Sequence, residues 1–297
     1  MAIKLILDTD IGTDIDDAWA LALCLASDEI DLIGVTLVHA DLDTRAKIAL
    51  KMLKLAGRTD VPVYKGLSNP LTPGAKLHWP GHEGTDTDFS DISGMEAPEG
   101  AIEFINDTLD RYPGEVVLAS IGPMTNVAAA IQRDPASMRK ARRFAIMAAN
   151  YTGEGPENAA PEHNAVVDPV ATKAVFESDI TSTVVGLNVT GKVVIRESDV
   201  EKLVGTPFGD YLGAMTRQYY GIAGRDYTFM HDPLAIATEI DRSVVNMRKM
   251  RAEVLVDGRI IFSHDNNGPL DVAVDVDVEK FEQLLFSKVD SLVKKGV

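Results

Sequence analysis

One stretch decides the fold of this sequence: Asp8-Thr9-Asp10-Ile11-Gly12-Thr13-Asp14-Ile15-Asp16-Asp17. It follows the short apolar run Ile3–Leu7, which predicts a buried strand, and it precedes Ala18–Ala26, which predicts a buried helix. A strand, a loop and a helix in this order are typical of the repeating unit of an α/β protein. The first strand therefore ends in a loop that carries five carboxylates within ten residues.

Strand-like and helix-like runs continue to alternate after this unit. The predicted helices are Thr44–Ala56, a second one that begins at Asn126, and a third from about Val278, after hairpin strands within Val254–Val276. The other predicted strands are Leu32–Val38, Val61–Tyr64, Glu115–Ala119, Arg143–Ala148 and Ser182–Leu187. Such alternation predicts a parallel sheet with helices on both faces. We therefore expect a single α/β domain, residues 1–297, with a mainly parallel, Rossmann-like central sheet flanked by helices.

The carboxyl ends of the predicted strands are where we expect a ligand site. Open parallel sheets bind their ligands in the loops at this edge. These loops follow Leu7, Val38, Ala119 and Ala148. Two long segments rich in glycine and polar residues, Gly66–Gly100 and Gly153–Asn164, are typical of functional loops.

The composition limits the partners of the chain. Its formal net charge is −16, from 45 acidic and 29 basic residues. So acidic a surface repels phosphate backbones and anionic lipid, which argues against nucleic-acid and membrane-surface partners. The single cysteine, Cys24, lies in an apolar run and has no disulfide partner within the chain. Without a secretory signal or an apolar stretch of membrane-spanning length, we expect a soluble, cytoplasmic protein.

The density of carboxylates in the acidic loop predicts a metal ion. One or two aspartates suffice to cap the helix that follows, and the remaining like charges need a cation. The candidate ligands are hard oxygens, with no neighbouring His/Cys set, so Ca²⁺ or Mg²⁺ is expected rather than zinc. A calcium loop of the EF-hand type does not fit, because the cluster follows a strand and lacks the required helix-side glutamate.

A Mg²⁺-dependent phosphatase of the haloacid-dehalogenase type is an alternative. Those enzymes also open with a strand and Asp-x-Asp, and the first aspartate, here Asp8, would be the nucleophile. Asp10-Ile11-Gly12-Thr13 only approximates their pattern. The alternative also leaves the pair Asp16-Asp17 at the start of the helix without a role.

Five short motifs follow one another along the chain. They are Asp8-Thr9-Asp10-Ile11-Gly12 with Asp16-Asp17-Ala18, then Ile121–Asn126, Glu162-His163-Asn164 with Asp168-Pro169, Gly186–Thr190 and His231–Ala235. Together they resemble the inosine-uridine-preferring nucleoside hydrolase family, with Asp14 and Ile15 as two extra residues in the first motif. Each motif alone is weak, but five in the family's order are specific. The resemblance implies the nucleoside hydrolase fold, with Gly186–Thr190 as a core strand.

The resemblance also implies which residues carry the reaction. Cleavage of a nucleoside C1′–N bond needs an activated water on one side and a stabilised leaving base on the other. Asp10 would be the general base and His231 the acid that protonates the base. Calcium would be held by Asp10, Asp17, Asp232 and the Thr125 carbonyl. The substrate would be bound by Asp16, Glu162 and Asn164 at the ribose, and by Asn158, Met147, Asp41 and His82 elsewhere in the pocket.

His231 favours one branch of the family. Members that prefer purines often carry a tryptophan at this place, so the histidine favours a pyrimidine-preferring or nonspecific enzyme. The resemblance further implies a homodimer or homotetramer whose other partner is a small nucleoside. A catalytically silent nucleoside- or ribose-binding protein on the same scaffold is the third hypothesis. The set Asp10, Asp17, His231 and Asp232 argues against it.

Overall fold

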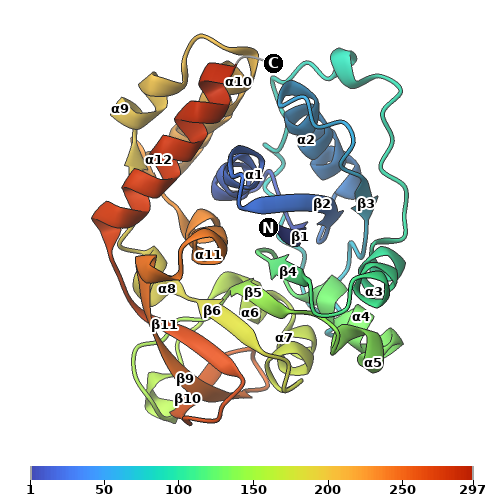
Figure 1. Ribbon diagram of the computed structural model, residues 1–297, viewed down its shortest axis with the longest axis vertical. Helices are drawn as coiled ribbons and strands as arrows, with labels where there is room; N and C mark the ends of the chain where they lie inside the picture. Colours follow the sequence, from blue (N-terminus) through green and yellow to red (C-terminus); the bar gives the residue numbers. More distant parts are fainter. Residues whose placement is uncertain (1, 296–297) are drawn as a thin grey trace.

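A nine-stranded sheet forms the centre of this computed structural model, which describes residues 2–295 (Figure 1). The predicted domain also includes Met1 and residues 296–297, which lie outside the described residues. The strands of the sheet are β1 (Ile3–Thr9), β2 (Ile30–Leu37), β3 (Val63–Lys65), β4 (Val116–Ser120), β5 (Arg143–Met147), β6 (Ser182–Val185), β9 (Val245–Val254), β10 (Ile260–His264) and β11 (Leu270–Val276). A separate antiparallel pair consists of β7 (Val194–Arg196) and β8 (Tyr227–Phe229).

β1 lies at the point where the order of successive strands along the sheet reverses. That order is β10-β9-β11-β6-β5-β4-β1-β2-β3, so successive strands run outward from β1 to one edge and from β4 towards the other. Within this sheet, as far as the structure describes it, the pairs from β3 to β11 are parallel, and β9 pairs antiparallel with β10 and β11. This is the mainly parallel sheet that the sequence predicts. A ligand crevice is expected at such a reversal point, beyond the carboxyl end of β1.

Helices cover both faces of the sheet (Figure 1). Those longer than one turn are α1 (Asp16–Ala26), α2 (Leu42–Leu55), α3 (Ala101–Arg111), α4 (Thr125–Arg133), α6 (His163–Val167), α7 (Pro169–Phe176), α10 (Pro207–Ala223), α11 (His231–Ile240) and α12 (Val278–Lys295). Single turns are α5 (Pro135–Met138), α8 (Leu187–Thr190) and α9 (Glu197–Val200), with 3-10 turns η1 (Ser90–Ile92), η2 (Pro156–Asn158), η3 (Glu201–Leu203) and η4 (Arg242–Val244). No helix in residues 2–295 is long and apolar enough to cross a membrane.

The alternation of side chains along β1 divides the core into two layers. Leu5 and Leu7 point into a cluster formed with α1, α2, α10, α11 and α12, whereas Ile6 points into a cluster formed with α3, α4 and α7. Successive side chains of a strand face opposite sides, so an unbroken apolar run is buried on both. All three side chains are fully buried. β1 is therefore held rigidly, and it fixes the position of the acidic loop at its end.

Most of the predicted elements lie where the sequence places them, with two differences. The prediction of a core strand at Gly186–Thr190 is wrong, because β6 ends at Val185 and Leu187–Thr190 forms α8. The backbone N–H groups of Val189 and Thr190 both donate to the Gly186 carbonyl, which closes a helical turn. The C-terminal strands also begin earlier than predicted: the predicted hairpin starts at Val254, whereas β9 starts at Val245.

Candidate active site

The carboxyl ends of β1 and β5 and the start of α11 meet around a cavity of about 220 Å³. Four aspartates that are close neighbours here come from two distant parts of the chain: Asp10, Asp16 and Asp17 from the first loop and helix, and Asp232 from α11. The helices α1 and α11 pack against each other, which brings the two groups together. The cavity is lined by Asp10, Thr13, Asp14, Asp16, Asp17, His78, Ile121, Met147, Glu162, His163, Asn164, Leu187, His231 and Asp232.

Three carboxylates form the centre of this cluster. One oxygen from each of Asp16, Asp17 and Asp232 lies within 4.8 Å of the others, and all three residues are buried. The Thr9 hydroxyl donates to Asp17 Oδ1 at 2.5 Å, and the Asp232 backbone N–H donates to Asp16 Oδ2 at 3.4 Å. These bonds orient the carboxylates of Asp17 and Asp16.

The cluster carries more negative charge than its surroundings can neutralise. Burial, together with the charge of the neighbouring Asp14, raises the pKa of Asp16 to about 8. Burial also raises the pKa of Asp17, as do the charges of Asp10 and Asp16. The pKa of Asp232 rises for the same reasons, with Asp16 and Asp17 as its nearest charges. Oxygen donors that repel one another in a closed cavity fit a divalent cation such as Ca²⁺ or Mg²⁺.

Glu162 and Asn164 form the opposite wall. Glu162 is the N-cap of α6, and it accepts the backbone N–H groups of Asn164, Ala165 and Ala149. Its pKa is nevertheless raised to about 7, because burial outweighs these bonds. The Asn164 amide nitrogen donates to the carbonyls of Ile121 at 2.7 Å and Met147 at 3.1 Å. These two acceptors fix the amide so that its oxygen Oδ1 is the group left for a ligand.

His231 lines the cavity from the first turn of α11. Its Nδ1 lies 2.7 Å from the Thr190 hydroxyl, which fixes the ring, so Nε2 is the nitrogen left for a ligand. Burial lowers the pKa of His231 to about 4; nearby Asp14 opposes this shift and Arg225 adds to it. The imidazole is therefore neutral at pH 7. If Thr190 donates to Nδ1, Nε2 carries the hydrogen and can donate it.

Thr125 lies next to the cavity but does not line it. It begins α4, and its hydroxyl donates to Asp168 Oδ2 at 2.8 Å. Asp168 is fully buried and accepts five hydrogen bonds, which tie the long loop before α3 to α4 and α7. Its donors are the N–H groups of Leu71, Thr72 and Ala171 and the hydroxyls of Thr72 and Thr125.

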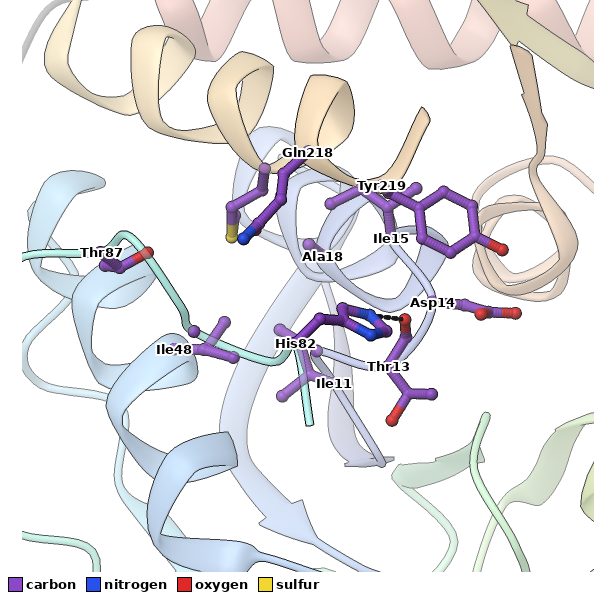
Figure 2. A pocket seen from close by; sticks show the side chains of 13 residues that line it. Ile11, Thr13, Asp14, Ile15, Ala18, Ile48, His82, Thr87, Gln218 and Tyr219 are labelled. Atoms are coloured by element: carbon purple, nitrogen blue, oxygen red, sulfur yellow. Dashed lines mark hydrogen bonds between the residues drawn. The ribbon is translucent and has the colours of Figure 1, made fainter. Parts of the chain in front are cut away.

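Three of the predicted substrate residues lie outside the cavity. Asp41 is the exposed N-cap of α2, where it accepts from the backbone of Asp43 and Thr44. The Asn158 side chain donates to the Glu154 carbonyl within its own loop. His82 lines a second cavity, where its Nε2 contacts the Thr13 carbonyl at 2.8 Å (Figure 2). In each case the side chain already makes a hydrogen bond with a backbone group of the protein.

The second cavity lies on the other side of the acidic loop. Figure 2 shows His82 and Gln218 facing it from the long loop and from α10, with Asp14 and Tyr219 at its edge. Thr13 and Asp14 line both cavities. His78 and His163, for which the sequence carries no signal of a role, line the first cavity, the one with the aspartates, and their ring centres are 5.4 Å apart.

Known proteins resemble this chain over most of its length. A sequence profile of the family described as inosine-uridine preferring nucleoside hydrolase matches residues 5–283. Uridine nucleosidase 1 of Arabidopsis thaliana is 31% identical over 263 residues, which cover 83% of this chain and 76% of the relative. The pyrimidine-specific ribonucleoside hydrolase RihA of Salmonella arizonae is 31% identical over an alignment that covers 97% of this chain and 99% of the relative.

Solved structures agree with the sequence relatives. A plant nucleoside hydrolase superimposes with a TM-score of 0.85 at 28% identity, covering 98% of this chain and 99% of that one. A purine-preferring ribonucleoside hydrolase from Gardnerella vaginalis gives a TM-score of 0.84 at 30% identity, with the same coverage. The chain therefore belongs to the inosine-uridine preferring nucleoside hydrolase family and is an N-glycosyl hydrolase.

Proposed function

We propose that this chain hydrolyses the N-glycosidic bond of ribonucleosides with the help of Ca²⁺, and that it is pyrimidine-preferring or nonspecific. The observation that carries the calcium proposal is the cluster of Asp16, Asp17 and Asp232 beside Asp10 in one cavity. The ligands would be Asp10, Asp17, Asp232 and the Thr125 carbonyl. A bound divalent cation lowers the pKa of a coordinated water and fixes its direction of attack.

In this proposal, one carboxylate of the cavity acts on the attacking water and the other polar side chains bind the ribose. Asp10 would take the proton from the attacking water as general base. Asp16, Glu162 and the Asn164 oxygen would bind the ribose hydroxyls, with Met147 as the apolar contact beneath. Each of these side chains lines the same cavity and is held by backbone hydrogen bonds or by packing, so the sugar would meet a preorganised site.

His231 would give a proton to the leaving base from Nε2. The ring is held by Thr190 and stands at the start of α11, next to Asp232. Proton transfer to the base would come from the imidazolium form, which the lowered pKa makes a minor but strongly acidic species at pH 7, because the neutral ring can only donate a hydrogen bond unless it becomes an imidazolate. This histidine supports activity on pyrimidines, although the similar structures include a purine-preferring enzyme.

The test is release of ribose from inosine, adenosine, guanosine, uridine and cytidine, with added Ca²⁺ and after thorough chelation. We expect release that falls on chelation and returns with Ca²⁺, with uridine or cytidine at least as fast as the purines. Ribose release that continues at the same rate after chelation would contradict the calcium proposal. Asp10→Asn should lower kcat by about 10²- to 10⁴-fold. The exposed Asp28→Asn serves as the control and should retain wild-type kcat.

The phosphatase alternative receives no support. Its nucleophile would be Asp8, but that side chain is fully buried and does not line the cavity. Asp8 Oδ1 accepts from the Thr36 hydroxyl and the Asn126 amide, which makes it a bridge between β1, β2 and α4. The silent binding protein likewise receives no support from the relatives, whose names are those of hydrolases.

Assembly and location are part of the proposal. We propose a homodimer or homotetramer that works in the cytoplasm on a small nucleoside. Light scattering coupled to size-exclusion chromatography would measure the mass of the particle, and the 32.1 kDa of a single chain would contradict an oligomer.

A further inference from the structure

Arg45 is a fully buried arginine in the first turn of α2 that the reaction described above does not use. A buried guanidinium is costly unless its donors are satisfied and its charge is balanced. Arginine carries five N–H donors in a rigid fork, so its partners reveal which part of the fold it holds. Here the partners belong to the acidic loop and to the end of β2.

The guanidinium holds the backbone carbonyls of Asp10 and of the residue that follows it. Nη1 donates to the Asp10 carbonyl, and to the Ile11 carbonyl at 3.0 Å. Nη2 donates to the Thr13 hydroxyl at 3.2 Å, and Nε donates to the His39 carbonyl at 2.7 Å. The Asp10 carboxylate completes the set, with Oδ2 4.0 Å from Nη2. One side chain thus fixes the loop before the metal cluster and supplies positive charge beside it.

The long loop Gly66–Gly100 also contacts this guanidinium. The Trp79 ring lies over it, with the Arg45 Cζ 5.1 Å from the ring centre. Glu83 accepts from the Thr13 hydroxyl at 3.0 Å, so the tip of the acidic loop is held from both sides. The His78 backbone N–H donates to His39 Nε2 at 3.1 Å. The Arg45 fork therefore joins the acidic loop, the end of β2 and the long loop into one unit.

We propose that Arg45 is a positioning residue that fixes Asp10 and the loop to Thr13, and that Trp79 keeps its guanidinium in place. The effect on turnover rests on the proposed role of Asp10 as general base. Lysine at this position would keep a positive charge but could not bond the carbonyls of Asp10, Ile11 and His39 together, because its donors lie on one nitrogen. Arg45→Lys therefore separates geometry from charge.

The first readout needs neither metal nor substrate. Hydrogen exchange of peptides that cover residues 10–14 should speed up by about tenfold in Arg45→Lys, because the loop loses its anchors. The matched control is Arg143→Lys, which breaks a pair of the same chemistry with Glu239 at the far end of β5. The control should leave exchange in this loop unchanged. Wild-type exchange of the loop in Arg45→Lys would overturn the proposal.

The second readout is functional. In Arg45→Lys we expect the Ca²⁺ dissociation constant, measured by calorimetry, to rise about tenfold and kcat to fall by about 10- to 100-fold. KM for the nucleoside should change little, because Asp16, Glu162 and Asn164 are not held by Arg45. A general loss of folding would instead lower the active fraction and the melting temperature, and it would not combine weaker Ca²⁺ binding with an unchanged KM. Wild-type kcat together with wild-type Ca²⁺ affinity would refute the positioning role.

A pair of loop variants keeps the proposal testable if Arg45→Lys fails to fold. Trp79→Leu removes the aromatic face and should repeat the faster exchange and lower kcat in weaker form, whereas Trp79→Phe should restore both. Equal behaviour of the two variants would exclude a role for stacking on Arg45. If the wild-type chain cleaves no ribonucleoside, the proposed function fails, but the exchange measurement still decides the role of Arg45.

Discussion

Gly122 offers a way to displace Asp10 without changing its chemistry. This glycine follows β4, and its backbone does not need the left-handed conformation, so alanine is tolerated locally. A Cβ at this position would lie 2.7 Å from Asp10 Oδ1, 2.9 Å from Asp10 N and 3.0 Å from Val38 Cγ1. Ordinary contacts begin near 3.4 Å, so the Asp10 carboxylate must shift by about 0.7 Å to make room in a close-packed site.

The expected result of Gly122→Ala is a folded protein with an impaired site. A misplacement of about 1 Å can cost about 10²-fold in rate, so we expect kcat to fall by about 10- to 100-fold. Overpacking should cost about 1–3 kcal/mol of unfolding free energy. Ribose-release kinetics and a urea titration measure the two effects. Gly221→Ala is the matched control, because its Cβ meets nothing within 4 Å. Wild-type kcat in Gly122→Ala would refute the role of Asp10 or the tightness of this contact.

Three further predictions follow from buried and exposed carboxylates. Asp168→Asn should cost about 2–4 kcal/mol of unfolding free energy by urea titration, because the amide nitrogen would replace a carboxylate oxygen that accepts at least two hydrogen bonds at either position; a loss below about 1 kcal/mol would contradict this. A carboxyl group with a raised folded-state pKa loses its stabilising effect as the pH rises from its unfolded pKa to its folded one. Ca²⁺, which binds the ionised form, should therefore raise the melting temperature more at pH 8 than at pH 5, and an equal rise at both would contradict this. The carboxyl groups concerned are the proposed ligands Asp17 and Asp232, because burial and the neighbouring aspartates raise the pKa of each. Asp41→Ala should lower the melting temperature through loss of a helix cap while KM stays unchanged. A several-fold rise in KM would instead support the prediction that Asp41 contacts the substrate.

The fold could be predicted because its signals are local. The unbroken apolar run at β1 and the β-branched run at β2 are buried on both faces, which is what a central parallel strand requires. Gly186–Thr190 shows the limit of this reasoning. Its apolar residues fit a strand or a helix, and the choice depends on the hydrogen bonds that its backbone makes with Gly186 and Ala149.

The site could be predicted only in part, for a different reason. The carboxylates of the first loop are visible in the sequence, but their meeting with Asp232 depends on the packing of α1 against α11. The sequence also carries a signal for Arg45. It shares the spacing i, i+3, i+4, i+7 with Ile48, Ala49 and Met52, all buried, so an arginine stands on the apolar face of its helix. A charge at such a position indicates a buried partner, which here is the acidic loop.

Residues of the acidic loop line two cavities, and each cavity holds a histidine that was predicted to act on the base. His231 lines the cavity with the carboxylates and has Nε2 available, so it can reach a leaving base without rearrangement. His82 lines the other cavity, and its Nε2 is bound to the Thr13 carbonyl. That bond would have to break before His82 could serve the same base. Thr13 is also held by Arg45 and Glu83, so such a movement would work against the contacts that fix Asp10. The geometry therefore favours His231 over His82 as the acid.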